Sequence, residues 1–183
     1  MSSQNLDGKV AIITGGSKGL GLAMAAGLAS AGAKTLLVNR TLEDGENAAK
    51  EIQEKYGRDS RAYAGDVCKQ QDMEGMAAAA MEHFGRIDIL INNAGINIRG
   101  PIDELKPEEF KHVMDVNVNG VWFASRAVFP QLKKAGRGSI INISSTRGLV
   151  GLANRTPYTP SKGAVVQMTR GLGLELAPFG ING

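Results

Sequence analysis

The sequence contains few of the residues that make disulfides and metal centres. Cys68 is the only cysteine among 183 residues, which excludes an internal disulfide and favours a reducing compartment. We expect this thiol to act as a small apolar filler without chemistry of its own. The two histidines, His83 and His112, have no second imidazole or paired carboxylates at ligand spacing. The sequence therefore gives no support for a bound metal.

Long apolar runs and one-sided charge are also missing. No apolar stretch approaches about 18 residues, and residues 1–5 lack a charged-then-apolar leader, so we expect neither a membrane span nor a signal peptide and predict a cytoplasmic location. Lys and Arg number 21 against 18 Asp and Glu, but they form no run of five, which argues against nucleic-acid binding. With 43% hydrophobic and 21% charged residues, the chain has the composition of one globular domain.

A buried strand, a glycine turn and a helix open the chain. Residues 9–14 form a continuous apolar run, typical of a strand buried on both faces of a parallel sheet. Glycines at 15, 19 and 21 permit positive φ and close approach of backbone amides, and a helix start supplies N–H groups for a pyrophosphate. The helix is expected to end at Gly32 and to share one apolar face among Leu20, Ala23, Met24, Gly27, Leu28 and Ala31. We interpret this unit as a dinucleotide site. No Gly-Lys-Ser/Thr closes the turn, which disfavours an NTPase loop.

Strands and helices then alternate to the end of the chain. We predict strands over residues 35–39, 61–64, 87–91 and 139–144, and helices over residues 43–56, 73–84, 106–134 and 156–177. Such alternation predicts an α/β fold with a parallel sheet, right-handed crossovers and helices on both faces. The helix at 73–84 carries a Met-rich core stripe made of Met73, Met76, Ala77, Ala80, Met81 and Phe84.

The helix at 106–134 has two notable features. Its apolar face, made of Val118, Val121, Trp122, Ser125, Phe129 and Leu132, is expected either to join the core or to form an oligomer surface. Asn117 interrupts this helix, and a buried amide there needs hydrogen-bond partners.

The end of the second predicted strand indicates which nucleotide binds. A dinucleotide fold that binds NAD carries an acidic residue there for the ribose hydroxyls, whereas this chain has Asn39-Arg40. Arg40, together with Lys18 of the glycine turn, is suited to a 2'-phosphate, so we expect NADP in preference to NAD. The alternative is that both cations are only solvated.

Tyr158 and Lys162 form a candidate acid/base pair. At i and i+4 of a predicted helix they lie on one face, about one turn apart. A fixed cation beside a phenol favours the phenolate, which suits general acid/base chemistry. Considered alone, the pair is more often a surface pair with no function. Its context decides, because Ser145 follows the predicted strand just upstream.

Taken together, these motifs resemble the short-chain dehydrogenase/reductase family over essentially the whole chain. The matching residues are Thr14-Gly15 with Gly19 and Gly21, Asp66 after the third strand, Asn92-Asn93-Ala94-Gly95 after the fourth, then Asn117, Ser145, Tyr158 and Lys162. The chain is similar to 3-oxoacyl-acyl-carrier-protein reductases and gluconate 5-dehydrogenases. The resemblance implies a Rossmann-type doubly wound sheet of strand order 3-2-1-4-5 in three layers. It also implies an NADP-dependent oxidoreductase that transfers hydride between the nucleotide and a carbonyl or secondary alcohol.

The resemblance assigns roles to individual residues. Tyr158 would exchange a proton with the substrate oxygen, Ser145 would hydrogen-bond that oxygen, Lys162 would assist Tyr158 and hold the nicotinamide ribose, and Asn117 would anchor a water. Cofactor-binding residues would be Gly15, Ser17, Lys18, Gly19, Leu20, Gly21, Arg40, Asp66, Val67, Asn92, Ala94 and Gly95, with Tyr158 and Lys162. The partners implied are a small substrate and further copies in a homodimer or homotetramer. The loop at 149–155 would border the substrate, and Arg155 would favour an anionic one.

The carboxyl-terminal end departs from the family pattern. Family members continue beyond Gly183 into a sixth strand, a turn at the nicotinamide, a substrate-covering segment and a seventh strand. We therefore expect residues 1–183 to form a single nucleotide-binding domain that is incomplete at this end, with the fifth strand as an exposed edge. Two functions stay open: a reductase, at least in its complete form, or a non-catalytic binding or assembly module.

Overall fold

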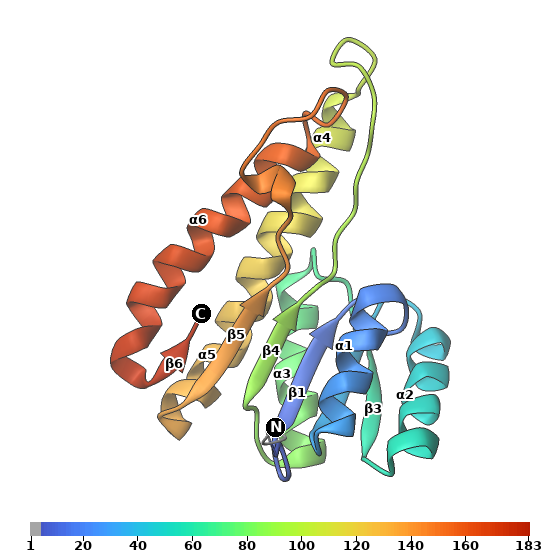
Figure 1. The fold of residues 1–183 in the computed structure, drawn as a ribbon, viewed down its shortest axis with the longest axis vertical. Helices are drawn as coiled ribbons and strands as arrows, with labels where there is room; N and C mark the ends of the chain where they lie inside the picture. The colour runs from blue at the N-terminus through green and yellow to red at the C-terminus, as the bar shows by residue number, and fades with distance from the viewer. Residues whose placement is uncertain (1–4) are drawn as a thin grey trace.

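The computed structural model describes residues 5–183. Residues 1–4, in which the sequence predicts no leader, lie outside this range. The elements in chain order (Figure 1) are β1 Val10–Thr14, α1 Gly19–Ser30, β2 Lys34–Asn39, α2 Leu42–Tyr56, β3 Ser60–Ala64, α3 Gln70–Phe84, β4 Ile89–Asn92, α4 Pro107–Met114, the π-helical segment η1 Asp115–Asn119, α5 Gly120–Ala135, β5 Gly138–Asn142, the 3-10 turn η2 Thr146–Gly148, α6 Tyr158–Leu176, the 3-10 turn η3 Ala177–Phe179 and β6 Ile181–Asn182. None of the helices within the described range has both the length and the apolar character that a membrane crossing requires.

All strands run parallel in one sheet of order β3-β2-β1-β4-β5-β6. This confirms the Rossmann-type order predicted for the first five strands. The expectation that the sixth strand is missing is wrong, because Ile181 and Asn182 pair with the start of β5. The chain returns to the sheet because Phe179 packs edge-on against Phe129 of α5, with ring centroids 5.6 Å apart. Only the first half of β5 is covered, and Ile141 further along is 44% exposed.

Two apolar layers sandwich the sheet, and β1 contributes to both. Ile12 joins the core formed with α3 and α5, whereas Ala11 and Ile13 face the core formed with α1 and α2. Alternate side chains of a strand point to opposite faces, so one short apolar strand serves both layers. Figure 1 shows α1 and α2 grouped together on one side of the molecule and α5 and α6 on the other. The predicted Met-rich stripe of α3 is confirmed as core, with Met73 and Met76 fully buried.

Helix α1 buries only part of the predicted face: Met24 and Leu28 are partly buried against the core, but none of the predicted residues is fully buried. Its buried residues are Gly21, Ala25 and Ala29, while Leu20 is 70% exposed. The sequence of α1 is apolar on every side, so its pattern does not select a face. The smallest residues, four positions apart, face inward because they let the helix approach the sheet and the glycine turn closely.

The predicted continuous helix over 106–134 is divided into α4 and α5 by the five residues of η1. A π-helical turn holds one more residue than an α-helical turn, so it shifts the buried face beyond it. In α5 the buried side chains are Val121, Ala124, Ser125, Val128 and Leu132. The predicted apolar face was expected either to join the core or to form an oligomer surface. Trp122 is 46% exposed and therefore does not belong to the core.

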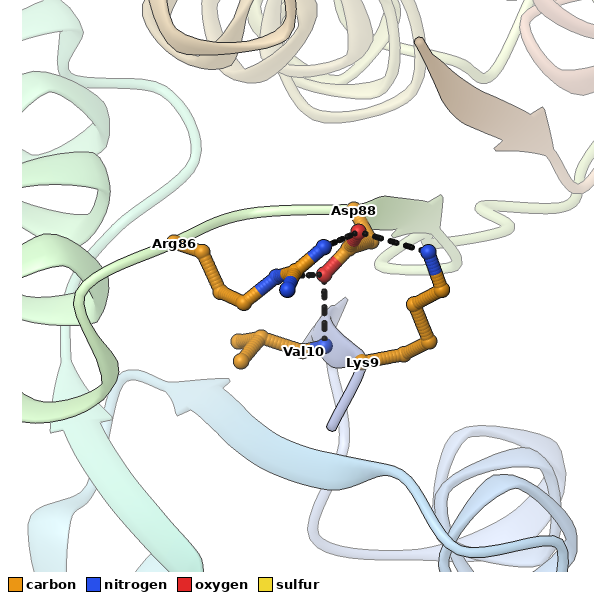
Figure 2. Close-up of polar contacts among 4 residues, drawn as sticks. All are labelled: Lys9, Val10, Arg86 and Asp88. Atoms are coloured by element: carbon orange, nitrogen blue, oxygen red, sulfur yellow. Dashed lines mark hydrogen bonds and ion pairs between the residues drawn. The ribbon is translucent and has the colours of Figure 1, made fainter. Parts of the chain in front are cut away.

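A cluster of charges stabilises the amino-terminal edge of the central strands (Figure 2). Arg86 binds the Asp88 carboxylate in a bidentate manner at 2.6 and 2.7 Å, the Val10 N–H donates to it at 3.0 Å, and Lys9 approaches to 3.3 Å. Burial alone would raise the pKa of Asp88, but the hydrogen bonds from Arg86, Val10 and Lys9 and the Arg86 charge together lower it. Asp88 and Val10 lie where β4 and β1 begin, at the edge opposite the glycine turn. This cluster therefore supports the fold away from the candidate site.

Candidate active site

The carboxyl ends of the central strands are tied together at one edge of the sheet. The Thr14 hydroxyl at the end of β1 accepts hydrogen bonds from the backbone N–H groups of Asn93 and Ala94 at 3.0 and 3.1 Å. The Asn93 side chain donates in return to the carbonyl oxygens of Thr14 and Gly15 at 3.0 and 3.1 Å. The glycine turn and the loop after β4 therefore form one rigid corner. Open parallel sheets bind ligands at such an edge.

The glycine turn has the geometry that an anionic group requires. Gly15 and Gly19 adopt positive φ of 63° and 57°, a conformation that other residues rarely take. A side chain at Gly19 would meet no protein atom within 4 Å, so the turn leaves open space in front of α1. Lys18 caps α1 without any side-chain hydrogen bond, which leaves the first N–H groups of the helix available to a ligand. These residues fit a pyrophosphate.

Gly21 supports the turn from behind. A Cβ at this position would overlap the carbonyl oxygen of Gly15 and lie 2.7 Å from the Asn93 side-chain nitrogen. Only glycine therefore lets α1 pack this closely under the turn.

A cleft runs from the glycine turn across the ends of β2 and β3 to the loop after β4. Eight residues expected to bind the cofactor line it, namely Gly15, Ser17, Lys18, Arg40, Asp66, Val67, Ala94 and Gly95. Eight further lining residues were not predicted as site residues: Val38, Asn39, Thr41, Asp44, Gly65, Ile96, His112 and Val116. Asn39 could have been found, because it ends the second strand, and its side-chain oxygen accepts from the Ser17 N–H at 2.9 Å. His112 and Val116 come from α4 and η1, and no local motif marks them.

Six of the fourteen predicted cofactor residues lie outside the lining of this cleft, among them Tyr158 and Lys162, which are described below. Gly19 and Leu20 are exposed at the start of α1, and Gly21 is buried beneath the turn. Asn92 is 3% exposed, and its side chain donates to Ser125 at 3.0 Å and to Asn142 at 2.8 Å. The Asn92 amide thus joins β4 to α5 and β5.

Tyr158 and Lys162 share one face of α6, as their spacing predicts. The Lys162 nitrogen lies 5.8 Å from the centroid of the Tyr158 ring and donates to the carbonyl oxygen of Ile143 at 2.7 Å. Lys162 is only 5% exposed, and burial lowers the pKa of its ammonium. A Cβ on Gly95 would lie 3.6 Å from this nitrogen. The cation is therefore positioned between the end of β5 and the loop after β4.

Ser145 follows β5 and directly precedes the turn η2. Its hydroxyl accepts from the Arg147 N–H at 3.2 Å and so begins the turn η2. This turn packs tightly on α6, because a Cβ at Gly148 would lie 2.7 Å from the carbonyl oxygen of Lys162. The same oxygen accepts from the Ser144 hydroxyl at 2.9 Å. The segment that carries Ser145 is thus fixed against the first turns of α6.

Asn117 is fully buried, and its amide is fully hydrogen-bonded. Its oxygen accepts from the Ile96 N–H at 2.8 Å, and its nitrogen donates to the Ile96 carbonyl at 2.9 Å and to the Ser161 hydroxyl at 3.0 Å. The partners that the sequence required are therefore backbone atoms and a serine. Asn117 joins the loop after β4 to α6, next to Lys162. No group of three or more His, Cys, Asp or Glu side chains in residues 5–183 is arranged to hold a metal.

A comparison with protein families matches residues 9–182 to the family described as short chain dehydrogenase. The chain belongs to the short-chain dehydrogenase family. The resemblance seen in the sequence is thereby confirmed, and the protein is an oxidoreductase of the kind that transfers hydride with a nicotinamide nucleotide.

Similar proteins within this family are dehydrogenases with different substrates. An uncharacterized oxidoreductase of Thermotoga maritima is 39% identical over 177 residues, which are 97% of this chain and 69% of the relative. Gluconate 5-dehydrogenase of Gluconobacter oxydans is 37% identical over 177 residues, again 97% of this chain and 69% of the relative. The crystal structure of NAD+-bound xylitol dehydrogenase superposes with a TM-score of 0.93 at 33% identity, covering 96% of this chain and 68% of that one.

Proposed function

We propose that this short-chain dehydrogenase is an NADP-dependent carbonyl reductase or alcohol dehydrogenase in which Tyr158 is the general acid and base. The observation that carries the proposal is the buried Lys162 ammonium, held by the Ile143 carbonyl and directed along the face of α6 that carries Tyr158. Ser145 lies on the segment packed against the same turns, and the glycine turn lies at the same edge of the sheet. Residues 1–183 would act as one nucleotide-binding domain.

The chain supplies each group that carbonyl reduction needs besides the hydride. When bound, the nicotinamide supplies or accepts the hydride. Tyr158 would donate its hydroxyl proton to the substrate oxygen as negative charge develops there, and Ser145 would donate a hydrogen bond to the same oxygen. Lys162 uses one of its three N–H donors on Ile143, so the others can bind ribose hydroxyls while its charge stabilises the phenolate that remains. Alcohol oxidation would reverse each transfer. Asn117 would hold Ile96 and Ser161 in place and support a water beside Lys162.

The test of this proposal is turnover of NADPH, followed at 340 nm, with a panel of ketones. Tyr158→Phe should lower kcat by about 10²- to 10⁴-fold, the usual contribution of a general acid. The matched control is Tyr56→Phe, which removes a hydroxyl from the end of α2 and should leave kcat unchanged. Full activity of Tyr158→Phe would show that another group is the acid. Nucleotide binding without turnover of any ketone would instead favour the non-catalytic binding module.

The preference for NADP rests on two cations at the adenosine end of the cleft. Lys18 and Arg40 both line the cleft and are exposed, so they can reach a 2'-phosphate. The Asp44 carboxylate lines the same cleft, and its negative charge disfavours a 2'-phosphate. The similar xylitol dehydrogenase structure contains NAD+, which has no such phosphate. Arg40→Ala should raise the Kd for NADPH about tenfold or more and leave that for NADH unchanged, while Asp44→Asn should lower the Kd for NADPH. Equal effects of Arg40→Ala on both nucleotides would refute the preference.

We also infer assembly into homodimers or homotetramers and a cytoplasmic location. Trp122 is 46% exposed on α5, with the Arg126 guanidinium 5.6 Å from its ring, so α5 presents a surface suited to a second copy. A monomer in sedimentation experiments at micromolar concentration would contradict this. A lone thiol such as Cys68 is compatible with a reducing cytoplasm.

A further inference from the structure

Three arginines lie on three segments that hydrogen bonds join ahead of α6. Arg99 lies in the loop after β4, Arg147 lies in the turn η2, and Arg155 lies just before α6. Among the described residues, none of the three forms an ion pair within 4.0 Å, although six ion pairs occur elsewhere. Arg147 and Arg155 are partly buried. Arg99 is exposed, so Arg147 and Arg155 are the two that are half-buried without a carboxylate partner in residues 5–183.

Two of these arginines are attached directly to residues of the proposed active site. The backbone N–H of Arg147 donates to the Ser145 hydroxyl oxygen at 3.2 Å. The carbonyl oxygen of Arg155 accepts from the Thr159 N–H at 2.9 Å, which holds Arg155 just before the start of α6. Arg155 precedes Tyr158, the first residue of that helix, by three positions.

Hydrogen bonds between the loops place the segment that carries Arg99 next to the segment that carries Arg155. The N–H of Gly100, next to Arg99, donates to the carbonyl oxygen of Asn154, next to Arg155, at 3.3 Å. The Arg147 guanidinium donates to the carbonyl oxygen of Gly151 in the same loop at 3.4 Å.

Arg99 and Arg147 both influence the pKa of Arg155. Burial lowers the pKa of the Arg155 guanidinium, and the charges of Arg99 and Arg147 lower it further, while Tyr158 raises it. No carboxylate contributes to this balance. Arg155 thus lies within the influence of two like charges that no ion pair among the described residues neutralises, and like charges at short range are unfavourable.

We propose that Arg99, Arg147 and Arg155 bind a carboxylate of the substrate, so that the enzyme acts on keto acids or hydroxy acids. The inference rests on the proposed function and specifies its substrate class. Guanidinium groups bind carboxylates in a planar, bidentate manner. Arg155 precedes Tyr158 by three residues, so a carboxylate bound there would lie several bonds from the reacting carbonyl.

The test compares acids with their neutral amides on the NADP+-loaded protein. Isothermal titration calorimetry measures the binding of 4-oxopentanoate and 6-oxoheptanoate and of the amide of each. The acids should bind at least about tenfold more tightly than the amides, and the difference should shrink between 0.05 and 0.5 M NaCl. Arg155→Ala and Arg147→Ala should each abolish the difference, and Arg155→Lys should restore part of it. Arg170→Ala, which removes an exposed arginine further along α6, should have no effect.

The outcomes separate this inference from the proposed function. Equal binding of acids and amides, or equal losses in Arg155→Ala and Arg170→Ala, would overturn the carboxylate site even if ketones are reduced. Arginine-dependent binding of the acids without NADPH oxidation would leave the anion site standing and refute the reductase. If both hold, Arg155→Ala should raise KM for the acids about tenfold or more, with little change in kcat and no change for the amides.

Discussion

Three glycines of α1 and its turn allow the nucleotide site to be tested separately from the fold. A Cβ at Gly21 would overlap the Gly15 carbonyl and lie 2.7 Å from the Asn93 amide, so Gly21→Ala must displace the turn. Overpacking of this kind costs about 1–3 kcal/mol of folding stability. Because Gly15 lines the cleft, the displaced turn should also bind NADPH about tenfold or more weakly, which corresponds to about 1.4 kcal/mol.

Gly27→Ala is the matched control in the same helix. Gly27 is exposed, and a Cβ there meets nothing within 4 Å. Alanine in place of glycine in a helix interior should raise the free energy of unfolding by about 0.5–1 kcal/mol. Nucleotide binding should be unchanged.

The Gly19→Ala variant distinguishes the cost of backbone strain, measured as folding stability, from the loss of space for the ligand, measured as nucleotide binding. Its φ of 57° disfavours alanine by about 1–2 kcal/mol, but the new Cβ would touch no protein atom. If the open space holds a pyrophosphate, NADPH binding should fall far more than stability does. Urea unfolding and fluorescence titration with NADPH measure the two quantities on all three variants. The reasoning fails if Gly21→Ala folds and binds as well as Gly27→Ala, or if Gly19→Ala binds NADPH normally.

Two further predictions concern groups outside the site. Asp88→Asn should lower the free energy of unfolding by about 1–3 kcal/mol at pH 7, because it weakens a buried, charge-assisted network. The folded pKa of Asp88 lies below its ordinary 3.8, so the stability it gives is complete at neutral pH and is lost as the pH falls through that lowered value. The difference in unfolding free energy between the two proteins should be equal at pH 7 and pH 5 and smaller at pH 3, and an equal difference at all three pH values would contradict the ionic explanation. Burial, aided by Asp66, raises the pKa of Cys68 to about 11. At pH 8, iodoacetamide should therefore modify the folded protein about 100-fold more slowly than the protein in urea, and equal rates would refute this.

The features predicted from sequence are those that neighbouring residues determine. A continuous apolar run followed by glycines specifies strand, turn and helix without reference to the rest of the chain. The alternation of such units, with right-handed crossovers, then restricts the sheet to few arrangements. Tyr158 and Lys162 share a face because four residues nearly complete a helical turn. Each of these inferences needs only local geometry.

The features that were missed depend on contacts between distant segments. The uniformly apolar sequence of α1 does not reveal its inner face, which the close approach to Gly15 decides. His112 of α4 lines the cleft together with residues that follow β1, β2, β3 and β4, far from it in the sequence. Lys9, Arg86 and Asp88 meet because β1 and β4 pair, and no motif joins them. The two residues of β6 carry too little pattern to be recognised as a strand.

The position of Lys162 illustrates why the i, i+4 spacing alone is insufficient for a catalytic pair. The Asn117 amide holds the Ser161 hydroxyl at 3.0 Å, the Ser144 hydroxyl holds the Lys162 carbonyl at 2.9 Å, and the Ile143 carbonyl holds the ammonium at 2.7 Å. These contacts come from the π-helical segment and from the end of β5, on either side of the first turns of α6. Asn117 stands in that π-helical segment, where the helical repeat changes between α4 and α5. An ordinary surface pair of tyrosine and lysine has no such anchors, so the pair becomes a site only where the sheet edge, η1 and α6 converge.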